Sequence, residues 1–179
     1  MKINTVKKTL KAYSLFFLVI LTTMLSCSKD DDSPSETIVE IWVLISSTSE
    51  NNYDINNDGT ATNNIELETN CSNNTTLEFN SDGAGTQEIE EFINIEYNET
   101  ADTFTTTCLT PANLNVDAVS QLTWVQNNNA RSYTSNGVTY EGTVSGSQLT
   151  VIIPNGFLIG DGMGQIYLQE DLTLVFQQQ

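Results

Sequence analysis

The residues best suited to bind an ion lie in one polar stretch, 54–66, where oxygen side chains alternate. Their spacing follows a calcium-loop pattern, with Gly59 where such a loop turns sharply. The closing acid, Glu66, lies one residue beyond its usual place, so we expect weak binding. The predicted metal ligands are Asp54, Asn56, Asp58, Thr60 (through its carbonyl) and Glu66. The alternative is a surface loop, since Asn, Asp and Gly favour turns by themselves.

Catalytic groups are scarce. The sequence contains no histidine, which excludes Ser/His/Asp and Cys/His arrangements and removes the commonest transition-metal ligand. Acidic residues are plentiful, so a hydrolase with paired carboxylates remains a distant alternative, although nothing in the sequence singles out a pair. We therefore expect a non-enzymatic protein.

Several aromatic residues could line a cavity for a sugar or an apolar ligand. In a small β domain such residues also form the ordinary core, and that alternative stays open. The candidate cavity residues are Trp42, Trp124, Tyr133, Tyr140 and Phe157.

The N-terminus has the profile of a secretory signal, with four lysines before an apolar run at 13–25 and no acid before Asp30. A helix over that run would reach only ~20 Å, against ~30 Å for the hydrocarbon core of a membrane. Ser26-Cys27 resembles the lipobox of bacterial lipoproteins, in which cleavage precedes an acylated cysteine. The resemblance implies a signal peptide at 1–26 and fatty acyl chains, such as palmitate, on Cys27.

Residues 27–37 form a polar, acidic tether. The stretch 28–32, Ser-Lys-Asp-Asp-Asp, resembles the export signal that sends some lipoproteins to the outer face of the outer membrane; a solvated linker is the alternative. The expected location is therefore the outer membrane, on its periplasmic or cell-surface side.

Cys71 and Cys108 are the remaining cysteines once Cys27 is acylated. In an oxidising envelope an isolated pair is most simply a disulfide. A redox-active pair is the alternative, although the C-x-x-C spacing that would favour it is absent.

The charge balance limits the partners. Beyond residue 26 the chain keeps Lys29 and Arg131 against 23 acidic residues. This surface repels phosphate backbones and anionic lipid, so nucleic-acid binding is excluded, and soluble partners should be neutral, cationic or metal-bridged.

Residues 38–179 predict one all-β domain. Apolar residues occur in short alternating bursts, separated by turn signals such as Asp82-Gly83 and Asn136-Gly137. Short strands joined in sequence favour a closed antiparallel barrel of about eight strands, with a two-sheet sandwich as the alternative. The predicted strands are 38–47, 75–80, 84–89, 92–97, 103–109, 121–126, 131–135, 138–144, 148–153 and 171–176, with a helical turn or loop at 110–120.

The order of motifs resembles the bacterial lipocalin-like lipoproteins. The resemblance rests on the Trp42 strand, the Asp-x-Asn-x-Asp-Gly loop, the two cysteines, Trp124 and the Tyr140-Glu-Gly-Thr-Val stretch. It implies an up-and-down barrel. Two departures are visible: the family's Gly-x-Trp reads Glu40-Ile41-Trp42, and no arginine near the chain end can stack over Trp42. Both departures argue against a deep ligand cup.

The expected function is a membrane-anchored, non-enzymatic binding module for a small apolar or sugar ligand or a protein partner. The alternative is a structural or adhesion domain with a filled barrel and a calcium-stabilised loop. An aromatic-lined interior of ~300 Å³ or more would favour binding.

Overall fold

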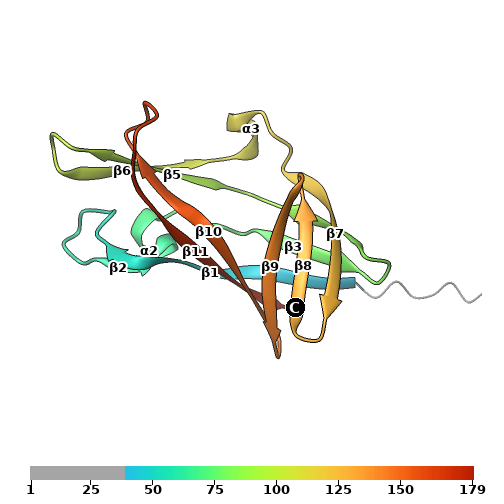
Figure 1. The fold of residues 1–179 in the computed structure, drawn as a ribbon. Coiled ribbons are helices and arrows are strands. Elements are labelled where there is room, and N and C mark those ends of the chain that lie inside the picture. Colours follow the sequence, from blue (N-terminus) through green and yellow to red (C-terminus); the bar gives the residue numbers. More distant parts are fainter. Residues whose placement is uncertain (1–38) are drawn as a thin grey trace, which may run out of the picture. The chain divides into compact units, whose positions relative to one another are not determined.

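The computed structural model describes residues 39–179. The predicted signal peptide, Cys27 and the tether lie outside this range. Within it, eight strands close into an antiparallel barrel, in the order β1-β3-β4-β7-β8-β9-β10-β11 and back to β1. The barrel confirms the predicted fold class (Figure 1). The strands are β1 Val39–Tyr53, β3 Thr76–Asn80, β4 Ala84–Glu88, β7 Val119–Asn127, β8 Ala130–Ser135, β9 Val138–Ser145, β10 Gln148–Gly160 and β11 Ile166–Gln178.

Alternation and turn chemistry explain the barrel strands. On β3, Leu77 and Phe79 are fully buried while their neighbours are partly exposed, so one face of the strand points inward. The β3–β4 turn has Gly83 at φ 85°, a conformation that favours glycine, and the Asp82 carboxylate accepts the Ala84 N–H at 3.0 Å. These predicted hairpin signals therefore fix the strand register.

One hairpin leaves the barrel. Strands β5 (Phe92–Asn98) and β6 (Thr103–Leu109), followed by helix α3 (Pro111–Leu114), lie between β4 and β7 in the chain, yet β4 pairs directly with β7. The expectation that successive strands all pair in sequence is wrong at this point. The hairpin meets the barrel strands through one parallel bridge, Glu96 to Gly160. Its alternation resembles that of barrel strands, so local pattern does not reveal the excursion.

Strands β10 and β11 extend far beyond their predicted bounds. Their pairing continues past a register shift between Ile153 and Phe157. Asn155 there has φ 55°, and its N–H donates to the Asp171 carboxylate at 2.9 Å. The Pro-Asn-Gly sequence at 154–156 is therefore a bulge inside a long ribbon and not the end of a strand.

Strand β1 also continues, to Tyr53, and two short elements follow the polar loop: β2 (Thr62–Asn64), which pairs with β1, and helix α2 (Ile65–Thr69). The Asn64 side chain caps α2 by accepting the Leu67 N–H at 3.0 Å. No helix among residues 39–179 is long and apolar enough to cross a membrane.

Two separate apolar clusters stabilise the domain. The barrel cluster lies inside the barrel and contains Trp42, Leu44, Leu77, Phe79, Leu122, Tyr133, Leu149, Val151 and Phe176. The outer cluster lies where the β5–β6 hairpin meets the outer part of β10 and the segment after β1, and contains Ile55, Ile65, Ile95, Phe157 and Ile159.

Candidate functional site

One end of the barrel is filled around a buried arginine. Arg131, on β8, is 3% exposed, and its guanidinium carbon lies 5.2 Å from the ring centre of Trp42 and 4.7 Å from that of Trp124. Its Nη1 donates to Glu40 at 2.7 Å, and Nε and Nη2 both donate to the Gln126 side chain. An arginine therefore does stack over Trp42, but it comes from the middle of the chain. The family pattern places this arginine near the chain end, so the pattern does not identify Arg131.

This filled end decides the role of the two tryptophans. Trp42 is 1% exposed and donates its Nε1–H to Glu40 at 3.2 Å. Trp124 donates to the carbonyls of Asn80 and Ala84 at 2.9 and 3.1 Å. Both side chains are thus committed to packing, and neither lines the cavity described next.

A cavity of about 460 Å³ lies between the two apolar clusters, at the other end of the barrel. Its walls come from the barrel interior and from β5 of the outer hairpin. Three of the five aromatic residues predicted from sequence line this cavity: Tyr133, Tyr140 and Phe157. The other apolar lining residues are Ile65, Ile89, Phe92, Ile93, Ile95, Ile153, Leu158, Leu172 and Leu174. A wider depression of about 900 Å³ adjoins it at Gln87, Ile89, Phe92 and Tyr140.

Two tyrosines form a pair in the cavity wall. Tyr133 and Tyr140 face each other across β8 and β9, with ring centres 4.9 Å apart and an angle of 22° between the rings. Burial raises the pKa of the Tyr133 hydroxyl, with a further contribution from Tyr140. The Tyr133 hydroxyl is thus a neutral hydrogen-bond donor at physiological pH. The remaining polar lining side chains are Ser47, Asn73, Thr75, Gln87, Glu91 and Asn94.

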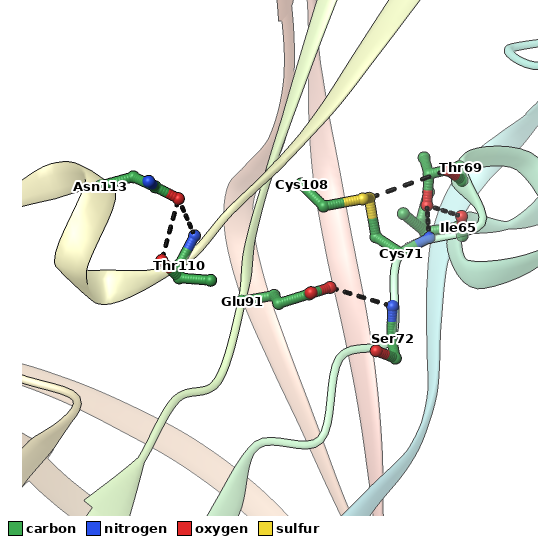
Figure 2. Close-up of a disulfide and its surroundings, with 8 residues drawn as sticks. All are labelled: Ile65, Thr69, Cys71, Ser72, Glu91, Cys108, Thr110 and Asn113. Atoms are coloured by element: carbon green, nitrogen blue, oxygen red, sulfur yellow. Dashed lines mark hydrogen bonds between the residues drawn. A yellow bond between two sulfur atoms is a disulfide. The ribbon is translucent and has the colours of Figure 1, made fainter.

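A disulfide fixes the hairpin that forms one wall of the cavity. Cys71 and Cys108 are bonded, as predicted, and join the segment after α2 to β6 (Figure 2). Cys71 is buried and Cys108 is exposed. Beside them, the Glu91 carboxylate accepts the Ser72 N–H at 3.1 Å. This is the only place among residues 39–179 where three cysteine or acidic groups converge closely, and its sulfurs are already used in the disulfide.

The predicted calcium loop folds as a hydrogen-bonded turn. Asp54 accepts the Asp58 and Gly59 N–H groups at 2.9 and 2.8 Å, and Asp58 accepts the Thr60 N–H at 2.8 Å. Glu66 points elsewhere, because its carboxylate binds the hydroxyl of Ser47 at 2.6 Å. The loop thus offers oxygen ligands of the right kind but lacks the closing acid, and calcium binding stays a prediction.

A different acid supports this loop. Glu68, on α2, is 2% exposed and accepts the N–H groups of Ile55 (2.9 Å), Asn56 (3.4 Å) and Thr62 (3.0 Å). Three such bonds compensate a buried carboxylate for its lost water. Sequence reasoning missed Glu68 because it falls outside the calcium-loop spacing. Its role here is structural.

Comparison of the chain with known protein families, curated proteins and solved structures gives no match. The function of this chain must therefore be inferred from its cavity.

Proposed function

We propose that this chain is a membrane-anchored, lipocalin-like binding module that holds a small apolar ligand in the cavity between the barrel and the β5–β6 hairpin. The cavity itself is the supporting observation. Its volume of about 460 Å³ lies within the usual range for small-molecule sites, ~300 to 1,000 Å³, and aliphatic and aromatic side chains predominate in its wall. Among residues 39–179, Glu91 is the only acidic residue in the lining, so this part of the chain gives a two-carboxylate hydrolase no second acid there.

Ligand binding is tested by native mass spectrometry of the purified protein and by titration with the neutral dye Nile red. We expect one dye molecule to bind, with increased fluorescence. The variant Ile93→Trp places a larger side chain in the cavity wall and should abolish binding. The matched control Ile45→Trp lies on an exposed part of β1 and should bind as the unmodified protein does. Equal binding by both variants would place the dye elsewhere.

Membrane attachment through Cys27 is the second part of the proposal. It rests on the lipobox and the short apolar run before it. Mass spectrometry of the N-terminal peptide should find fatty acyl chains on Cys27, and Cys27→Ser should move the protein from the membrane to the soluble fraction. Protease treatment of whole cells then distinguishes surface display from the periplasmic face.

The filled half of the barrel favours a second candidate, a structural or adhesion domain. The stack of Arg131 on Trp42, Phe79 and Trp124 occupies that end with the protein's own side chains. If the cavity proves unable to bind any small molecule, this is the remaining assignment, with the loops making contacts to a protein partner.

A further inference from the structure

We infer that the cavity is selective for an uncharged ligand, one with an apolar body and a hydrogen-bond acceptor oxygen that the hydroxyls of Tyr133 and Tyr140 bind. This inference rests on the proposed function and names the chemical class of its ligand.

The Tyr133 hydroxyl supplies the first argument. The residue is 2% exposed and lines the cavity, and its hydroxyl has no hydrogen-bond partner among residues 39–179. Every completely buried side-chain nitrogen or oxygen in that part of the chain has a partner. The small exposed part of Tyr133 must therefore include its hydroxyl, which faces the cavity. A nearly buried donor without a protein partner hydrogen-bonds to water or to a ligand atom inside the cavity, so an acceptor oxygen of a ligand can take the place of that water.

Tyr140 provides a second hydroxyl next to that of Tyr133. It lies directly opposite Tyr133, with the rings stacked, and its hydroxyl also has no partner among the described residues. Each phenol hydroxyl can donate a hydrogen bond to a ketone, ester, ether or hydroxyl oxygen. The two tyrosines thus form a polar position in an otherwise mainly apolar wall.

Charge supplies the second argument. Arg131 is the only basic residue among residues 39–179, and its guanidinium is held at the filled end by Glu40 and Gln126. The part of the cavity wall formed by residues 39–179 contains Glu91 and no base. A carboxylate or phosphate entering the cavity would lose water without gaining a counter-charge, which is strongly unfavourable. A neutral acceptor has no such cost.

The test compares two ligands of similar length, 2-decanone and decanoate, in displacing Nile red at pH 8. We expect 2-decanone to bind at least tenfold more tightly, because only decanoate carries a charge. Tyr133→Phe keeps the ring and removes the hydroxyl, so it should weaken 2-decanone binding about fivefold, the worth of one hydrogen bond. The matched control Tyr167→Phe lies outside the cavity and should leave the affinity unchanged.

The outcomes separate this inference from the proposed function. If decanoate binds as tightly as 2-decanone, the selectivity is refuted although the cavity still binds ligands. If Tyr133→Phe and Tyr167→Phe bind 2-decanone equally well, the tyrosine pair is not the acceptor site. If neither the dye nor either ligand binds, the proposed function fails and the inference fails with it.

Discussion

Removing the disulfide should loosen the β5–β6 hairpin before it unfolds the barrel. Cys71 and Cys108 are 37 residues apart, and the chain between them contains β3, β4, β5 and most of β6. On the loop-closure model a crosslink of this length stabilises the folded state by up to about 4 kcal/mol. For a domain of this size that corresponds to a fall in melting temperature of about 10 °C.

The assay combines thermal unfolding with hydrogen exchange. Cys71→Ala/Cys108→Ala should melt about 10 °C lower than the oxidised protein, and a reducing agent should lower the melting point of the unmodified protein by a similar amount while leaving the variant unchanged. Amide exchange should rise first in β5 and β6, because the disulfide and the outer cluster attach them to the rest of the domain.

A loss of less than about 1 kcal/mol would refute this reasoning, since loop closure would then contribute little. Uniform exchange in all strands would also refute it, because the hairpin and the barrel would be one cooperative unit. The design is favourable for such a test, since Cys108 is exposed and accessible to reductants.

Three further predictions concern the filled end, the cavity wall and the loop. Arg131→Ala should lower the free energy of unfolding, measured in urea, by about 3 kcal/mol, because it leaves a void and an unpaired Glu40. Arg131→Met should lower it less, because the methionine side chain fills part of the void. Equal losses in the two variants would contradict this role of packing. Burial raises the pKa of Tyr133 in the folded state, so the stabilisation from the protonated hydroxyl is complete below pH ~10 and is lost as pH rises further. The free energy of unfolding of Tyr133→Phe should therefore fall less between pH 9 and pH 11 than that of the unmodified protein. An equal fall in both proteins would contradict the effect of burial. Calorimetry should detect calcium binding to the 54–66 loop with a Kd of ~10⁻⁴ to 10⁻³ M. Asp58→Ala should abolish this binding, and the control Asp82→Ala, in the β3–β4 turn, should retain it. No heat at millimolar calcium would show that the loop does not bind calcium.

Much of the barrel is predictable from sequence because many of its strands alternate regularly and end at recognisable turns. Strand β3 is predicted at 75–80 and observed at Thr76–Asn80, and the Asn136-Gly137 turn adopts the positive φ values that its residue types favour. The fold class follows from this regularity. The local pattern of a strand does not reveal which other strand it pairs with, since β5 alternates like a barrel strand yet lies outside the barrel.

The candidate site is less predictable, for a physical reason. Tyr133, Tyr140 and Phe157 line the cavity while Trp42 and Trp124 do not, because a buried arginine on β8 occupies the space between the tryptophans. Nothing in the residues around Arg131 distinguishes an inward cation from a surface one; its position follows from the register of β8 in the closed barrel. Likewise Glu68, and not Glu66, turns toward the polar loop because α2 presents it there.

The segment 89–118 is inserted between β4 and β7, so the domain consists of a closed barrel and an inserted hairpin with helix α3. Glu88 pairs with Val119, and the Ile89 N–H donates to the Ala118 carbonyl at 2.9 Å, so the two ends of the inserted segment are adjacent. A short turn joining 88 to 119 would preserve barrel closure while deleting one wall of the cavity. The sequence of the inserted segment can therefore vary without disturbing the barrel to which it is joined.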